Sequence, residues 1–285
     1  MAVIEKVSVM GAGVMGSGIA QAAAQAGYQV TIRDIEPRLL ERCLNFIDES
    51  LEIMKEKGKM AAEERDDILS KIKTTLNVEE AAEESDLLIE AIPEDMNLKK
   101  QLFEDLDNMC PSHTILATNT SSLSITVIAS MTRRPDKVIG MHFSNPVPVM
   151  RGVELVKGKD TSEETLEIVK DVCRRMGKDF FISSDFPGFT GNRLLPLFIN
   201  EAFYLVWQGI STAEDVDKAC KLQLRHPMGP LELADFIGLD TLLAILEYLY
   251  KEMDDKYRPC PLLKQFVQAG HLGKKTGRGV YQYEK

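Results

Sequence analysis

The chain has 285 residues, of which 44% are apolar, and carries a formal net charge of −10 at pH 7. This length accommodates two domains, and the charge argues against nucleic acid or an anionic membrane surface as the main partner. The five cysteines are scattered without a C-x-x-C pair, which is typical of reduced thiols and of neither a disulfide framework nor a metal site. No apolar run reaches transmembrane length, and the first expected strand leaves no room for a signal peptide. We therefore expect a cytoplasmic protein.

Residues 6–34 have the pattern of a dinucleotide-binding βαβ unit. A buried strand over residues 7–10 is followed by G-x-G-x-x-G (Gly11, Gly13, Gly16), a helix, and a strand over 30–32 that ends on Asp34. Gly11 permits a tight turn, Gly13 lets the backbone approach a pyrophosphate, and Gly16 lets the helix pack close to the strand. The helix N-terminus offers N–H groups to the phosphates. Asp34 can accept hydrogen bonds from the ribose hydroxyls, which favours NAD over NADP.

Residues 37–72 are predicted to form a helical hairpin. Apolar residues recur at helical spacing over 39–54, Gly58 breaks the pattern, and a second amphipathic helix runs from about Ala61 to Ile72. Lys55, Lys57 and Lys59 lie near its tip. They indicate either a solvated lysine face or a phosphate-binding edge on an otherwise acidic protein.

Strands and helices alternate through the next hundred residues. Strands are expected over residues 86–92, 114–118, 138–143, 153–156 and 180–183, with helices over 94–109 and 162–176. This alternation predicts an α/β fold, a Rossmann-type doubly wound sheet. The polar run 119–122 directly follows a strand, and ligands bind outside the carboxyl ends of strands in such sheets.

His142 and Glu154 are the candidate proton-transfer pair. If strands 138–143 and 153–156 form an antiparallel hairpin centred near Pro148, His142 lies opposite Glu154 at a distance that lets the carboxylate hold the imidazole. Histidine suits proton transfer near neutral pH, and a paired acid fixes its tautomer and stabilises the imidazolium. The alternative is a structural core histidine. Ser121 as a hydrolytic nucleophile is disfavoured because the G-x-S-x-G elbow is missing, and the sequence has no metal-ligand spacing.

A boundary near residue 186 divides the chain into an NAD-binding domain, 1–186, and an all-helical domain, 187–285. Helices are expected over 194–207, 212–221, 230–237, 240–254 and 261–269. The first is apolar nearly all round, so one face is expected to meet its own domain and the other a second subunit. Asn192 either caps this helix or reaches back into the cleft.

Several motifs together carry a family resemblance over essentially the whole chain. They are GAGVMGSGIA with Asp34, NTSSLSIT, HFSNP, PGF-x-x-NR, HPMGPLELAD-x-x-GLD and GKKTG-x-G-x-Y. The sequence resembles the bacterial short-chain L-3-hydroxyacyl-CoA dehydrogenases, the 3-hydroxybutyryl-CoA dehydrogenase group. The resemblance implies NAD-dependent interconversion of an L-3-hydroxyacyl-CoA and a 3-ketoacyl-CoA. It also implies a Rossmann domain, a helical dimerising domain, a cleft between them, and a homodimer.

The resemblance also implies roles for individual residues. His142 would be the general base with Glu154 as its partner, and Ser121 and Asn192 would bind the oxygen at C3 and the thioester region. Ser50 and Lys57 on the hairpin match positions that contact CoA. Together, the glycine motif and the resemblance give these cofactor positions: Gly11, Gly13, Val14, Met15, Gly16, Asp34, Glu94, Lys99, Ser121, Asn145 and Lys275.

Some positions depart from the family pattern near these residues. Ser144 stands where Phe is usual, Gly152 and Gly191 replace larger apolar residues, and 222–225 replaces a small, glycine-containing stretch. The sequence therefore predicts the type of reaction more firmly than it predicts the acyl group of the substrate. The alternatives are a dehydrogenase of a free or differently activated 3-hydroxy acid, as in carnitine or gulonate dehydrogenases, and a non-catalytic crystallin-like protein. The 3-hydroxyacid dehydrogenases with a catalytic lysine rank lower, since they should lack HFSNP and Glu154.

Overall fold

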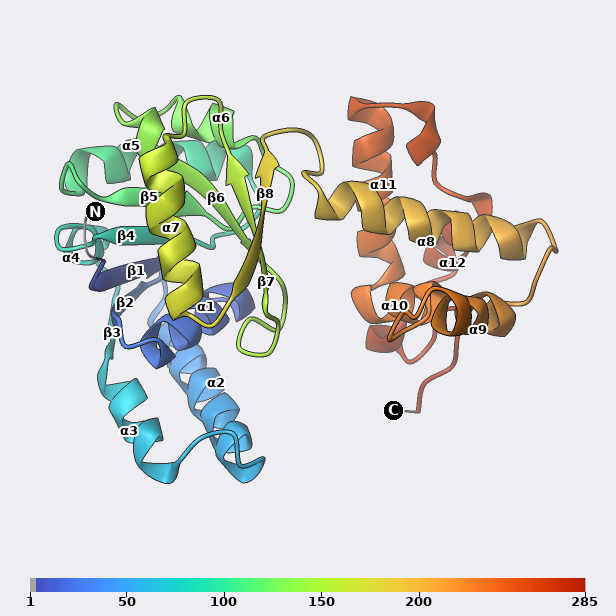
Figure 1. Ribbon diagram of the computed structural model, residues 1–285, viewed down its shortest axis with the longest axis horizontal. Helices are drawn as coiled ribbons and strands as arrows, with labels where there is room; N and C mark the ends of the chain where they lie inside the picture. Colours follow the sequence, from blue (N-terminus) through green and yellow to red (C-terminus); the bar gives the residue numbers. More distant parts are fainter. Residues whose placement is uncertain (1–3, 285) are drawn as a thin grey trace. The chain divides into compact units, whose positions relative to one another are not determined.

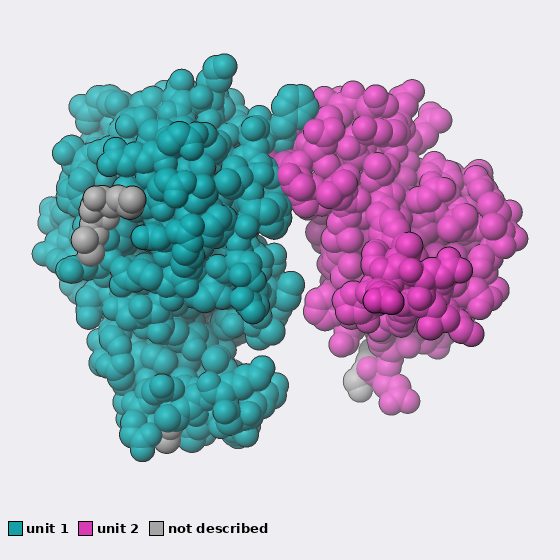
Figure 2. All heavy atoms as spheres, viewed as in Figure 1, with its two compact units in different colours: residues 1–186 teal, residues 187–285 magenta. Residues whose placement is uncertain are grey.

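The structure is a computed structural model that describes residues 4–284. The chain forms two compact units, residues 1–186 and 187–285, which are coloured separately in Figure 2. The first unit contains a large sheet with helices around it, and the second is helical. None of the helices described is long and apolar enough to span a membrane.

One sheet organises the first unit (Figure 1). Its eight strands, counted within residues 4–186, lie in the order β3-β2-β1-β4-β5-β6-β7-β8. All neighbouring pairs are parallel except β6 with β7, which are antiparallel. The strands are β1 (Lys6–Met10), β2 (Gln29–Arg33), β3 (Ile72–Thr75), β4 (Leu87–Glu90), β5 (Ile115–Thr118), β6 (Val138–Phe143), β7 (Gly152–Lys157) and β8 (Asp179–Ser184).

Helices cover both faces of this sheet. On one face, Val7 and Val9 of β1 share an apolar cluster with Ile19 and with residues of three helices: α1 (Val14–Gln25), α2 (Pro37–Glu56) and α7 (Glu163–Arg175). On the opposite face, the Ser8 hydroxyl donates to the Ala81 carbonyl at 2.5 Å, within α4 (Val78–Ala82). That face also carries α5 (Met96–Met109) and α6 (Ile125–Ala129). The predicted doubly wound Rossmann-type sheet is confirmed.

The helical hairpin differs from its prediction at its end. Its second helix, α3 (Ala62–Ser70), stops two residues early, and Ile72 begins the edge strand β3. The expected helix through Ile72 is therefore wrong. Ile72 continues the apolar spacing of α3, but its backbone pairs in parallel with Val30 of β2. Ladder pairing and the β-branched run Ile72, Thr74 and Thr75 favour the extended backbone.

The second unit is built from α8 (Gly191–Trp207), α9 (Ala213–Gln223), α10 (Pro230–Ile237), α11 (Leu239–Glu252) and α12 (Pro261–Gln268). The predicted helices are confirmed to within three residues at each end. Ile199 and Phe203 of α8 are buried in the core of this unit, whereas Leu194 and Trp207 are 66% and 50% exposed. The predicted contact of α8 with its own domain is confirmed, and its contact with a second subunit stays a prediction.

Candidate active site

The three glycines of the first loop have different structural roles. A Cβ at position 11, where φ is +107°, would lie 2.5 Å from the Ala91 carbonyl oxygen, and one at position 16 would lie 1.8 Å from the Gly11 oxygen. Both glycines are therefore required by packing. A Cβ on Gly13 would meet nothing within 4 Å. Gly13 is also the N-cap of α1 and supplies no side-chain acceptor to its first turn. This open, donor-rich helix end fits a pyrophosphate.

Asp34 is fixed beside this loop at the end of β2. Its Oδ2 accepts from the Ala12 N–H at 2.6 Å, and its Oδ1 accepts from the Ile35 N–H at 2.6 Å. The carboxylate thus lies next to the glycine loop and keeps lone pairs for further donors. A ribose diol suits such an acceptor, whereas a 2′-phosphate would be repelled by its charge.

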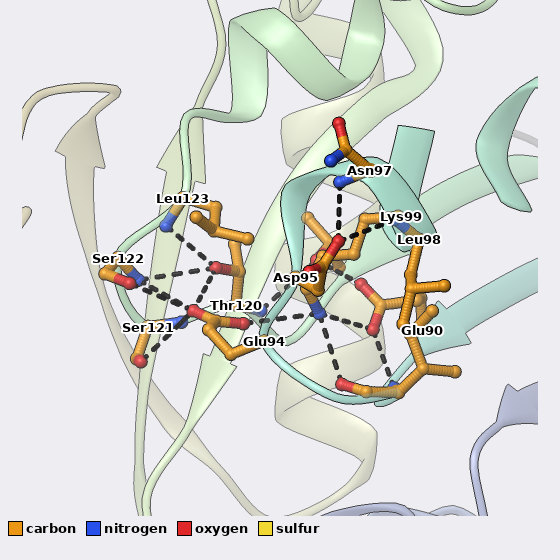
Figure 3. A network of polar contacts seen from close by, with 12 residues as sticks. Glu90, Glu94, Asp95, Asn97, Leu98, Lys99, Thr120, Ser121, Ser122 and Leu123 are labelled. Carbon is orange, nitrogen blue, oxygen red and sulfur yellow. Dashed lines mark hydrogen bonds and ion pairs between the residues drawn. The ribbon is translucent and has the colours of Figure 1, made fainter. Parts of the chain in front are cut away.

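Glu94 connects a polar network at the carboxyl ends of β4 and β5 (Figure 3). Its Oε1 accepts from the Thr120 hydroxyl at 2.6 Å and from the Ser121 and Ser122 N–H groups at 3.0 and 3.2 Å. Burial raises the pKa of Glu94, but these hydrogen bonds and the nearby Lys99 ammonium outweigh burial, so the pKa lies below its usual value. Glu94 is therefore an ionised acceptor that shapes the turn carrying Ser121.

A buried ion pair supports this network. The Lys99 ammonium lies 2.5 Å from Glu90 Oε1 and 3.3 Å from Glu94 Oε2, and the side chains of Lys99 and Glu90 are 1% and 0% exposed. Glu90 Oε2 also accepts from the Thr118 hydroxyl at 2.6 Å. Burial raises the pKa of Glu90, in opposition to the pairing with Lys99. Glu90 was not predicted from the sequence, although a single carboxylate within the apolar run LLIEAI was a usable signal.

His142 and Glu154 are direct partners across the antiparallel strands β6 and β7. His142 Nδ1 lies 3.3 Å from Glu154 Oε2, and Glu154 is 3% exposed. Glu154 Oε1 accepts from the Ser183 hydroxyl of β8 at 2.5 Å. The predicted register is confirmed. Ser183, which the sequence analysis did not single out, fixes the carboxylate from the other side.

Asn119 links the turn that carries Ser121 to strand β6, which carries His142. Its Oδ1 accepts from the Phe143 N–H at 3.0 Å, directly after His142. The ends of β5 and β6 are thus tied together by a side chain that follows β5. Because β1, β4, β5 and β6 are parallel, the glycine loop, the Glu94 network and His142 all lie at one edge of the sheet.

The remaining predicted residues lie on the hairpin, in the loop after β6 and in the second unit. Ser50 is half-buried on α2, and Lys57 is exposed directly after it. Asn145 is exposed in the loop after β6. Asn192 lies in the first turn of α8 and Lys275 pairs with Asp240 at 2.6 Å, both within the second unit. Within residues 4–284, the structure has no group of three potential metal-ligating side chains.

The other histidines have structural surroundings. His113 lies 3.1 Å from Asp86 Oδ1 and is exposed, and the His226 ring packs 5.1 Å from that of Phe198. The His271 ring packs 6.2 Å from Phe266.

Comparison with known proteins places this architecture in a family. Residues 6–185 match the model of the 3-hydroxyacyl-CoA dehydrogenase NAD-binding domain, and residues 188–283 match that of the C-terminal domain. The chain belongs to the 3-hydroxyacyl-CoA dehydrogenase family. It is 52% identical to the probable 3-hydroxybutyryl-CoA dehydrogenase of Bacillus subtilis, over 99% of this chain and 98% of the relative. It is 47% identical to the 3-hydroxybutyryl-CoA dehydrogenase of Clostridioides difficile, over 98% and 100%.

A solved structure has the same fold. The crystal structure of (S)-3-hydroxybutyryl-CoA dehydrogenase from Ralstonia eutropha superimposes with a TM-score of 0.95 at 43% identity, covering 99% of this chain and 100% of that chain. The family match makes the first unit an NAD-binding domain. The open Gly13 and the fixed Asp34 carboxylate are the features of this chain that fit the dinucleotide.

Proposed function

We propose that this protein is an NAD-dependent dehydrogenase that interconverts a short-chain L-3-hydroxyacyl-CoA, foremost 3-hydroxybutyryl-CoA, and the corresponding 3-ketoacyl-CoA. The observation that carries the proposal is the His142–Glu154 pair at the sheet edge that also holds the glycine loop. Membership of the 3-hydroxyacyl-CoA dehydrogenase family supports the substrate class.

Proton transfer follows from the geometry of this pair. With Glu154 opposite Nδ1, a neutral His142 carries its proton on that nitrogen and presents the Nε2 lone pair as the base. Nε2 takes the proton of the C3 hydroxyl, and the Glu154 carboxylate stabilises the imidazolium that forms. The hydride acceptor for C3 would be supplied by NAD when it is bound at this sheet edge. In the reverse direction, Nε2–H returns the proton to the ketone oxygen.

Two side chains orient the reacting part of the substrate. Ser121 donates to the oxygen at C3 from the turn that Glu94 shapes, and Asn192 donates to the thioester region. Lys99 acts on the cofactor side through Glu94, because its ammonium is buried between Glu90 and Glu94. The glycine loop would hold the pyrophosphate of NAD, Asp34 would hold the ribose, and Asn145 and Lys275 would complete the cofactor contacts.

The hairpin holds the CoA moiety. Lys57 is exposed after the last turn of α2, where a cation can meet a phosphate, and Ser50 lies two turns earlier on that helix. The exposed Leu194 and Trp207 of α8 support a homodimer, since large apolar side chains at a surface favour a partner. We assign this dimer to the cytoplasm.

The experiment that tests the reaction compares the wild-type enzyme with His142→Ala, using acetoacetyl-CoA and NADH. The variant should bind NADH with an unchanged dissociation constant, since His142 lies on β6, and two strands separate β6 from β1, which the glycine loop follows. Its kcat should fall by about 100-fold or more, the range expected for loss of a general base. A kcat close to the wild-type value would refute the proposed role of His142.

A further inference from the structure

The loop of residues 144–151, between β6 and β7, begins two residues after His142 and carries Asn145. The Pro146 carbonyl accepts from the N–H groups of Val149 and Met150 at 3.0 and 2.9 Å, so residues 146–150 form a tight turn. Val149 is 70% exposed, whereas Val147 is buried in the core of the unit. One side of the turn is therefore packed into the core through Val147, and the other side faces solvent through Val149.

One anchor is the helix that follows the glycine motif. Gly18 of α1 faces the turn so closely that a Cβ there would lie 2.9 Å from the Val147 Cβ. The helix whose N-terminus fits the pyrophosphate thus packs directly on the turn after His142. A shift of the turn therefore changes the position of Asn145 relative to the pyrophosphate site.

The second anchor is Lys178, in the connection between α7 and β8. Lys178 is 7% exposed, and its ammonium donates to the Val147 carbonyl and, at 2.8 Å, to the Met150 carbonyl. Burial lowers its pKa. No carboxylate pairs with it within residues 4–284. An ammonium is buried at considerable cost, and here the groups that replace its water are two carbonyls of the turn.

The surroundings leave room for the turn to move. An open surface depression of about 300 Å³ borders it, lined by α1 residues, by Pro148 and Val149, and by Lys178 itself. On this side, at Pro148 and Val149, no side chains pack closely enough to hold the turn in place. The position of the turn therefore depends on both anchors: the packing of Val147 against Gly18, and the two hydrogen bonds from Lys178.

We propose that Lys178 is a positioning residue for cofactor binding, which holds the turn of residues 146–150, and with it Asn145, against α1. The inference rests on the proposed function in one respect, namely that Asn145 contacts NAD. His142 is held separately by Glu154 within the sheet. Loss of Lys178 should therefore weaken cofactor binding much more than it slows the chemical step.

The test uses Lys178→Met, which keeps the length of the side chain and removes its donors, beside Lys178→Arg, which restores charged donors. Lys218→Met, at an exposed position of α9, is the matched control. The dissociation constant of NADH is measured by fluorescence. We expect about a tenfold increase for Lys178→Met, recovery with arginine, no change in the control, and kcat at saturating NADH within about threefold of wild type. An unchanged dissociation constant would overturn the proposal.

Two further measurements separate positioning from a general loss of stability. Trypsin should cleave faster after the exposed Arg151 in Lys178→Met, because the adjacent turn is released. In a double-mutant cycle, Lys178→Met added to Asn145→Ala should raise the NADH dissociation constant no further than Asn145→Ala alone. Fully additive effects would show that Lys178 does not act through Asn145.

The readouts also separate this proposal from the proposed function. NADH binding and proteolysis require no thioester, so inactivity towards acetoacetyl-CoA would refute the proposed function and leave the binding test intact. Lys178→Gln is measured in parallel because it retains one donor group. It keeps the comparison available if the methionine variant does not fold, and its expected dissociation constant lies between those of Lys178→Arg and Lys178→Met.

Discussion

Glu154→Gln is the substitution that tests the proton-transfer site most sharply. The glutamine keeps the shape of the side chain, which is 3% exposed, and keeps an acceptor for the Ser183 hydroxyl. It removes the negative charge that faces His142 Nδ1 at 3.3 Å. A hydrogen bond to a charged group contributes about 1.5–3 kcal/mol. Since about 1.4 kcal/mol is a factor of ten in rate, kcat should fall by roughly 10- to 150-fold.

The assay is NADH consumption with acetoacetyl-CoA at saturating concentrations of both, with NADH binding measured separately. Glu163→Gln is the control, because Glu163 lies on α7, is 74% exposed and pairs with Lys157. We expect this control to retain kcat within about twofold, as for surface pairs generally. If Glu154→Gln also retained more than about half of the wild-type kcat, the charge of Glu154 would have no role in the reaction.

Three further predictions follow from other parts of the structure. Gly13→Ala should weaken NADH binding but lose less than about 1 kcal/mol of stability, because its Cβ enters open space and the only cost is a poorer N-cap. Gly16→Ala should lose about 1–3 kcal/mol or more through its clash with Gly11, and equal stability of the two variants would contradict this. Burial raises the pKa of Asp107, but hydrogen bonds from two arginines outweigh it and lower the pKa, so the stability gained at neutral pH is lost as the pH falls below about 4. Asp107→Asn should therefore flatten the dependence of the urea midpoint on pH in that range, and an unchanged slope would exclude this linkage. Lys57→Ala should raise KM for acetoacetyl-CoA by about fivefold without lowering kcat, since an exposed ion pair contributes about 1 kcal/mol. An unchanged KM would show that Lys57 does not contact CoA.

The sheet was largely predictable because its central strands are short apolar runs with glycine or polar residues at their ends. Residues 7–10 and 138–143 match β1 and β6 to within one residue. The edge strand β3 was not predicted, because Ile72 lies at helical spacing from Ile68. Its extended backbone is set by pairing with β2, which lies about forty residues earlier in the chain. The local spacing of apolar residues gives no information about this tertiary contact.

Part of the candidate site was predictable for a similar reason. His142 and Glu154 lie on adjacent strands of a short hairpin, so the centre of the turn sets their register. Glu90 and Lys178 were not predicted, because a charged residue in a sequence is most often exposed. Their partners, Lys99 for Glu90 and the carbonyls of the 146–150 turn for Lys178, become visible only when distant segments are brought together.

The most direct test of the proposed reaction is the rate of NADH consumption with acetoacetyl-CoA, measured beside free acetoacetate and a longer 3-ketoacyl-CoA. Rapid consumption with acetoacetyl-CoA, slower consumption with the longer thioester and little with the free acid are expected for a short-chain thioester dehydrogenase. Equal rates with acetoacetate and acetoacetyl-CoA, or no consumption with any of them despite NADH binding, would contradict the proposed substrate class.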